Sequence, residues 1–348
     1  MSRRARDLVR RRPHLDGGRS HPGREAHDGQ RGEQSMVPPA DFRSYYGRPV
    51  IKEPVWEAPG VPGYLFLGGL AGASSALAAG ADLAGCPELA RTSKIAAVSA
   101  IGLSAVALVR DLGRPARFYN MLRVFKPTSP MSVGSWLLTA YSPAAGVAAA
   151  SAVTGLLPPA GRVATAAAAV LGPGVAAYTG ALLADTAVPA WHDAHREMPY
   201  LFVGSAATAA GGLGLMLVRS EQSRPARNLA VVGAAAELIA KGLLLRRLGP
   251  TAAPYESGRS GNLMEVAEVL TASGLTAVAL GGQSRAVAAL AGAALVASSA
   301  VTRFGVFFAG VRSAGDPRYT VVPQRERLRE KAAPHPAGPM EESASSAP

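Results

Sequence analysis

Long runs of Ala, Gly, Leu and Val with almost no charge alternate with short polar segments along most of the chain. An α-helix needs about 20 apolar residues to cross a bilayer, and a window of that length finds eight such runs. The runs lack the polar stripe that a helix of a soluble bundle shows to solvent. We therefore predict an all-α integral membrane protein with eight transmembrane helices, at residues 62–84, 93–109, 135–157, 163–186, 200–218, 226–245, 264–281 and 286–311.

Two of the predicted spans contain a proline. Ser142-Pro143 interrupts the third span, and Gly172-Pro173-Gly174 interrupts the fourth. Broken helices mark the binding sites of many secondary transporters, where they occur in pairs in two related halves. Both interruptions fall in the first half of this chain, and the second half has no matching proline within a span. A secondary transporter or ion translocator stays an alternative function.

The two ends of the chain differ from the spans in composition. Residues 1–40 are rich in Arg, Gly and His without apolar periodicity, which predicts a disordered basic tail rather than a signal peptide. Residues 41–61 contain several Tyr, Trp and Pro residues and are expected to form a lead-in at the membrane interface. Residues 313–348 are expected to be a disordered C-terminal tail.

The distribution of basic residues predicts the orientation. An even number of spans places both termini on one side of the membrane, together with the loops after the second, fourth and sixth spans. Most of the Lys and Arg residues lie on that side, with or without the first 35 residues. Under the positive-inside rule, both termini should be cytoplasmic, and the protein should lie in the cell membrane.

Composition limits the chemistry that the chain can hold. The formal net charge of +12 is concentrated in ends and loops, so it reflects topology and gives no reason to expect a nucleic-acid partner. A single Cys cannot hold an iron–sulfur cluster, and none of the six His residues lies in the middle of a span, where a haem would need axial ligands. No metal-ligand spacing is present. We expect no haem, iron–sulfur cluster or metal in this chain.

The longest informative loop joins the second and third spans, at residues 110–136. It mixes Arg, aromatic and Pro residues and is longer than a simple connection requires. Two interpretations stay open: a structured surface element that docks a partner, or an interfacial amphipathic helix with snorkelling Arg side chains.

Ionisable groups within or at the ends of spans are costly in a membrane and are usually functional. Glu237 and Lys241 stand four residues apart on the sixth span, a spacing that favours an intrahelical ion pair. Asp185 ends the fourth span close to His192, which can titrate near neutral pH. The candidates for a proton relay are Asp82, Asp185, His192, Glu237 and Lys241, although ordinary polar contacts would also explain them.

Several short motifs are recognisable together. They are residues 44–49 (SYYGRP), 111–120 (DLGRPARFYN), 126–136 (KPTSPMSVGSW) and 178–183 (YTGALL), with a further match at Pro189–Trp191. In this combination the sequence resembles the NrfD family, the membrane subunits of polysulfide reductase-like and nitrite reductase-like complexes. The resemblance extends from about residue 45 to residue 329.

The resemblance implies an eight-helix subunit made of two four-helix bundles, here residues 62–186 and 187–312. Such a subunit passes electrons between the menaquinone or quinone pool and a ferredoxin-like iron–sulfur subunit, which serves a molybdopterin catalytic subunit. The quinone, a bound substrate, is expected in the first bundle. Tyr178 of the YTG motif would hydrogen-bond a quinone oxygen, and Tyr64 stands where family members often have His.

The resemblance also implies a docking face for the iron–sulfur partner beside the quinone site. We expect this face in the loop after the second span, where the docking residues would be Asp111, Arg114, Arg117, Asn120 and Arg123. The basic residues would steer an acidic partner electrostatically. A passive membrane anchor that never contacts quinone is the second alternative function.

Overall fold

The computed structural model describes residues 50–332 except residues 53, 55, 57, 112–115 and 281–283. The predicted tail at residues 1–40, the last residues of the predicted C-terminal tail and Arg114 therefore lie outside the described residues. Of the predicted lead-in, the part from residue 50 onwards is described.

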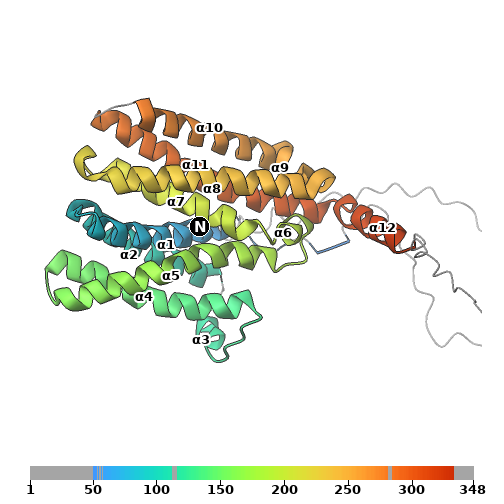
Figure 1. Ribbon diagram of the computed structural model, residues 1–348. Helices are drawn as coiled ribbons and strands as arrows, with labels where there is room; N and C mark the ends of the chain where they lie inside the picture. The colour runs from blue at the N-terminus through green and yellow to red at the C-terminus, as the bar shows by residue number, and fades with distance from the viewer. Residues whose placement is uncertain are drawn as a thin grey trace, which may run out of the picture. The chain divides into compact units, whose positions relative to one another are not determined.

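Eight long helices, each apolar enough to cross a membrane, account for most of the described residues, which confirms the predicted all-α membrane fold (Figure 1). Helices α4 and α5 begin at a proline, a few residues before the predicted starts of their spans. Proline suits the first helical position because its missing N–H would have no partner within the helix there. The helices are α1 (Gly60–Leu83), α2 (Pro87–Asp111), α4 (Pro130–Thr154), α5 (Pro158–Ala184), α7 (Met198–Leu217), α8 (Arg224–Leu248), α10 (Gly258–Leu280) and α11 (Arg285–Gly315).

The long helices pack as two groups of four. In the first, α1 contacts α2 and α5, and α4 also contacts α2 and α5. In the second, α7, α8, α10 and α11 pack in the same way. The groups meet where α1 and α5 contact α7. The apolar windows of α1 and α7 are both 72% buried, against 22% for α4, so α1 and α7 form the centre and α4 is peripheral.

Close packing in the first bundle depends on small residues. Gly72 of α1 and Gly172 of α5 face each other, and a Cβ on either would overlap the carbonyl of the other. Close backbone approach is how helices associate in lipid, where there is no hydrophobic force between them. Glycine therefore fixes how closely α1 and α5, two of the helices that line the pocket described below, approach each other.

The two prolines do not break their helices. Pro143 lies inside α4 and Pro173 inside α5, and both helices are continuous across them. Transmembrane helices tolerate such prolines because neighbouring groups satisfy the freed carbonyl. The paired broken helices of a transporter site are thus not found at these positions.

Short elements lie between the long helices and after the last of them. They are α3 (Arg117–Met121), α6 (Pro189–Asp193), α9 (Ala253–Glu256), α12 (Arg318–Ala332) and the 3₁₀ turns η3 (Ser220–Gln222) and η4 (Gly249–Ala252). Because consecutive long helices run in opposite directions, α3, α6, α9 and α12 belong to the same end of the bundle, here called the terminal end (Figure 1). Helix α12 lies within the segment predicted as a tail; its charged sequence gave no apolar signal.

Candidate functional site

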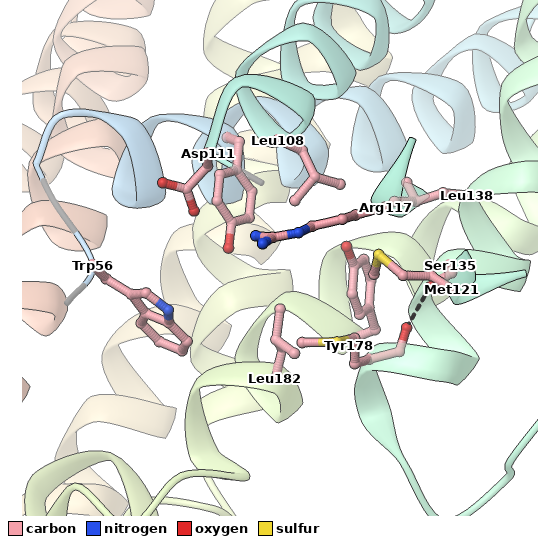
Figure 2. Close-up of a pocket in the computed structure, with 11 residues that line it drawn as sticks. Trp56, Leu108, Asp111, Arg117, Met121, Ser135, Leu138, Tyr178 and Leu182 are labelled. Carbon is pink, nitrogen blue, oxygen red and sulfur yellow. Dashed lines mark hydrogen bonds between the residues drawn. The ribbon is translucent and has the colours of Figure 1, made fainter. Parts of the chain in front are cut away.

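A pocket in the described part of the chain lies in the first bundle near the terminal end. It has a volume of about 440 Å³ and draws residues from the lead-in, α1, α2, α3, α4 and α5 (Figure 2). Both tyrosines predicted from the resemblance line it. The lining residues are Trp56, Tyr64, Leu108, Asp111, Arg117, Met121, Met131, Ser135, Leu138, Tyr178 and Leu182.

A second pocket, of about 310 Å³, adjoins the first and shares four residues with it: Tyr64, Leu108, Leu138 and Tyr178. Its other walls are mostly apolar side chains of α2 and α4, including Ile101. The two tyrosines therefore stand at the border between a pocket with charged groups and an apolar one.

Tyr64 is positioned by the packing of α1 against α2. It lies one turn into α1 and is only 6% exposed. Ser104 of α2 donates a hydrogen bond to its backbone carbonyl over 2.9 Å, which joins the two helices at this level. The phenol is thus presented to both pockets from a fixed backbone.

Tyr178 is positioned by α4. Its ring packs directly on Gly134, where a Cβ would overlap the ring carbons. Three residues of the same helix also line the larger pocket: Met131, Ser135 and Leu138. Ser135 Oγ donates a hydrogen bond of 2.6 Å to the Met131 carbonyl. The segment at residues 126–136, which carried part of the resemblance, therefore forms the wall and the support for Tyr178.

Charged groups stand at the outer rim of the larger pocket. Asp111 is the last residue of α2, and its Oδ1 lies 4.0 Å from the point where a Cβ would stand on Gly60, the first residue of α1. A carboxylate is stabilised near a helix N-terminus by the exposed N–H groups and the helix dipole. Arg117 of α3 extends across the pocket (Figure 2).

Two of the residues expected to dock a partner also line the pocket. Asp111 and Arg117 are in its wall, whereas Asn120 and Arg123 are exposed outside it. Trp56, which was not predicted as a site residue, also lines the pocket and stacks on Trp191 with ring centroids 5.5 Å apart. The sequence placed Trp56 in the aromatic lead-in, but it did not indicate that this segment packs against the first bundle.

None of the five relay candidates lines the tyrosine pockets. Asp82 forms an ion pair of 2.7 Å with Lys94 at the far end of α1, about 27 Å from Tyr64 at 1.5 Å per residue. Asp185 and His192 are exposed at the terminal end and line neither of the two adjoining pockets.

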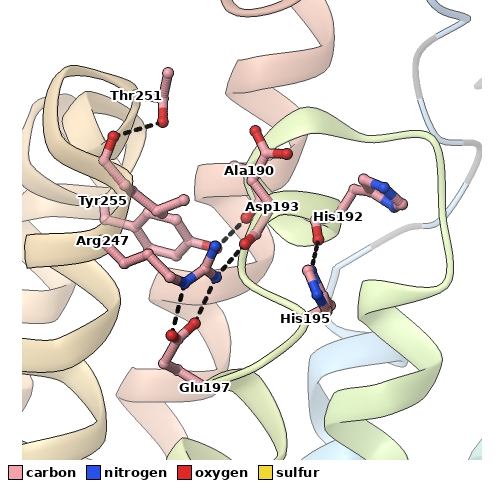
Figure 3. A network of polar contacts seen from close by, with 9 residues as sticks. Ala190, His192, Asp193, His195, Glu197, Arg247, Thr251 and Tyr255 are labelled. Carbon is pink, nitrogen blue, oxygen red and sulfur yellow. Dashed lines mark hydrogen bonds and ion pairs between the residues drawn. The ribbon is translucent and has the colours of Figure 1, made fainter. Parts of the chain in front are cut away.

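The loop that carries His192 belongs to a polar network at the terminal end of the second bundle (Figure 3). Arg247 of α8 binds both carboxylate oxygens of Glu197 over 2.6 and 2.5 Å and also donates to the carbonyl of Asp193. The Arg247 guanidinium lowers the pKa of the Glu197 carboxyl below its ordinary value. Tyr255 of α9 donates to the Ala190 carbonyl over 2.7 Å. This network ties α6 to α8 and α9.

The predicted pairing of Glu237 and Lys241 requires a correction. Lys241 forms an ion pair of 2.5 Å with Glu268 of α10, because its long side chain reaches across to the neighbouring helix. Glu237 points inward, is only 6% exposed, and accepts a hydrogen bond of 2.8 Å from Thr302 of α11. The two residues lie in the second bundle, apart from the tyrosine pockets.

The polysulphide reductase family NrfD matches residues 50–246, more than half of the chain. The match spans the first bundle, both pockets, and α7 and nearly all of α8. The chain belongs to the NrfD family. It is thus a multi-pass membrane protein of the kind that forms the membrane subunit of polysulfide reductase-like complexes. No curated protein matches the chain. Within this NrfD chain, the matched region contains every residue of the tyrosine pockets.

Proposed function

We propose that the two adjoining pockets bind a membrane quinone, and that the protein passes electrons between the quinone pool and an iron–sulfur subunit. The observation that carries this proposal is the position of Tyr64 and Tyr178, two phenols at the border between a charged pocket and an apolar one. A quinone has the matching form, a polar ring with two oxygens and an apolar tail.

The size and lining of the pockets support this substrate class. Small-molecule sites usually have volumes of about 300–1,000 Å³ with a few polar groups on apolar walls. The ring would occupy the larger pocket, where phenols and the Arg117 guanidinium can donate hydrogen bonds to its oxygens. The apolar pocket between α2 and α4 would take the first part of the tail.

The chain's own residues account for the handling of protons. Reduction of a quinone to a quinol takes up two electrons and two protons, so groups beside the oxygens must supply protons from water. Tyr64 and Tyr178 hold and orient the ring by hydrogen bonds. Asp111 stands at the exposed rim of the same pocket, where a carboxylate can exchange protons between the aqueous phase and the phenols.

The electrons would come from, or go to, a partner subunit. We propose a ferredoxin-like iron–sulfur subunit of a molybdopterin-type complex, docked over the pocket rim at the terminal end. Asn120 and Arg123 are exposed beside the pocket, so they suit the docking role better than Asp111 or Arg117. With the basic loops on that side, the partner would dock from the cytoplasm.

Quinone binding is tested by Trp fluorescence, because Trp56 lines the larger pocket and a bound quinone would quench it. A short-tailed quinone should quench the purified chain in lipid nanodiscs in a saturable way. Tyr178→Phe should weaken the affinity by about tenfold, the equivalent of one hydrogen bond.

The matched control is Tyr200→Phe, because Tyr200 is exposed on α7 and lies outside the pockets. It should leave the affinity unchanged. Unsaturable quenching of the unaltered chain would favour a passive anchor, and equal affinities for both Tyr variants would remove Tyr178 from the site.

A further inference from the structure

A cluster of polar side chains lies inside the second bundle, where neither the quinone pockets nor the proposed function uses it. Its centre is Glu237 of α8 and Arg303 of α11, and Arg303 is fully buried. Ser205 of α7 and Ser299 of α11 add a hydrogen bond of 2.9 Å between their hydroxyl groups. A charged pair at this depth is costly unless its polar atoms are satisfied.

The polar atoms of this pair are only partly satisfied. Glu237 Oε1 accepts the hydrogen bond from Thr302, and Arg303 Nη2 donates to the carbonyl of Phe202 over 2.7 Å while its guanidinium lies 3.8 Å from the centre of the Phe202 ring. Glu237 Oε2 and Arg303 Nε and Nη1 have no hydrogen-bond partner within the described part of the chain. The two side chains interact electrostatically without a direct ion pair between these described residues.

The unpartnered atoms have the composition of a water site. One carboxylate oxygen accepts and two guanidinium nitrogens donate, which gives three polar partners, the usual number for a buried water molecule.

A small cavity connects Glu237 with a more exposed ion pair. Its volume is about 10 Å³, close to that of one water-sized probe, and its wall includes Glu237, Thr302, Lys241 and Glu268. Glu268 is 48% exposed at its side chain. A single small cavity therefore lies between the buried Glu237 carboxyl and the partly exposed Glu268 carboxylate.

We propose that Glu237 and Arg303 form a hydrated proton-exchange site, separate from the tyrosine pockets, whose exchange route to the surface passes Lys241 and Glu268. The bound species are one water molecule and a proton. A proton enters from the aqueous phase, converts the Glu237 carboxylate to the acid, and leaves by the same route, with no change of oxidation state.

The charged groups around Glu237 are few. Arg303 faces it from α11, Lys241 lies one turn along α8, and Glu268 faces the connecting cavity from α10. Helices α7 and α1 bring small or neutral residues to this region, such as Ser205 and Gly69, which lies against the Arg303 guanidinium. Protonation of Glu237 thus changes the charge that compensates Arg303.

Infrared difference spectroscopy of the full chain in nanodiscs tests this site without any quinone. As the pH falls, a carboxylic-acid C=O band should appear reversibly and shift when H₂O is replaced by D₂O. Labelling Glu with ¹³C should shift the band, which assigns it to a glutamic acid in the unaltered protein. Absence of such a band throughout the pH range in which the protein stays folded would overturn the proposal.

Variants then locate the site and its route. Glu237→Gln should abolish the band, whereas Glu265→Gln, at an exposed position of α10, should retain it. Lys241→Met should slow deuterium exchange of the band on the order of tenfold, because an apolar side chain closes the polar route. Lys94→Met, at the far end of the first bundle, is the control and should leave the exchange rate unchanged.

Each outcome is decisive. A band that persists in Glu237→Gln overturns the assignment, and equal exchange rates in the Lys241 and Lys94 variants overturn the route. If Glu237→Gln does not fold, Glu237→Asp is used in its place. With ¹³C-labelled Glu, this variant carries no label at position 237 and should lose the band that shifts with the label. These experiments contain no quinone, so a negative result would overturn the proton-exchange site and leave the fluorescence test of quinone binding unaffected.

Discussion

At the scale of single residues, the pocket depends on neighbours that carry no chemistry. Tyr178 has a reactive phenol, but its ring is placed by Gly134, which has no side chain. The motif at residues 126–136 signalled family membership, and its contact with the YTG motif gives that signal a physical basis. A search of the sequence for polar groups does not find a glycine that is needed because another side chain packs directly on its backbone.

Gly134→Ala should therefore disturb the pocket. The added methyl overlaps the Tyr178 ring, so we expect the ring to shift, the quinone affinity to fall about tenfold, and the stability to fall by about 1–3 kcal/mol from overpacking. Gly146→Ala is the control, because nothing lies within 4 Å of a Cβ at that position of α4. Fluorescence quenching and thermal unfolding measure the two effects, and equal behaviour of both variants would contradict the prediction.

At the scale of elements, short segments at the terminal end are held by polar contacts rather than by length. Helix α6 has five residues, yet Trp191 is fully buried and donates to the Val306 carbonyl of α11 over 2.8 Å. Tyr255 and Arg247 contact the same loop (Figure 3). The loop after α5 is thus part of the second bundle, and His192 is placed at its surface.

The ion pair of Glu197 and Arg247 predicts a pH-dependent contribution to stability. In the folded protein the pKa of the Glu197 carboxyl lies below its ordinary value of 4.5. The contribution to stability is therefore present above pH 4.5 and is lost as the pH falls through the lowered pKa. Both side chains are partly exposed, which limits the contribution to less than about 1 kcal/mol.

Glu197→Gln should therefore lower the thermal stability slightly at pH 7. The difference from the unaltered protein should shrink as the pH falls through the lowered pKa of the Glu197 carboxyl. Glu221→Gln, at an exposed position in η3, serves as the control and should change little at either pH. A difference that grows with acidification would show that the pair does not act through its charge.

At the scale of the whole molecule, the two central helices separate two kinds of polar site. α1 and α7 are buried between the bundles, with the tyrosine pockets on the first-bundle side and the Glu237–Arg303 cluster on the other. This separation would let the two sites exchange protons independently. It also places the pocket rim, α3 and α12 at one end of the fold.

The orientation of that end in the membrane is testable. A reporter fused after Arg329, or a label at Arg123, should report from the cytoplasm, because the basic loops lie on that side. A signal from outside the cell would reverse the side on which the partner docks. The common side of the loop and the C-terminus follows from eight spans and would survive that result.

The sequence by itself determined the number of spans, their approximate positions and the family, because a bilayer imposes length and apolarity on every helix that crosses it. It also indicated Tyr178 through the YTG motif, and Tyr64 through its position in the first span, where family members often have His. Only the tertiary structure decided which side chains lie together. Trp56, Asp111 and Arg117 line the same pocket. Lys241 forms its ion pair with a residue of α10 rather than with one of its own helix. Contacts between helices depend on how each helix is rotated about its axis. In runs of Ala, Gly, Leu and Val with no polar stripe, the sequence contains almost no information about that rotation.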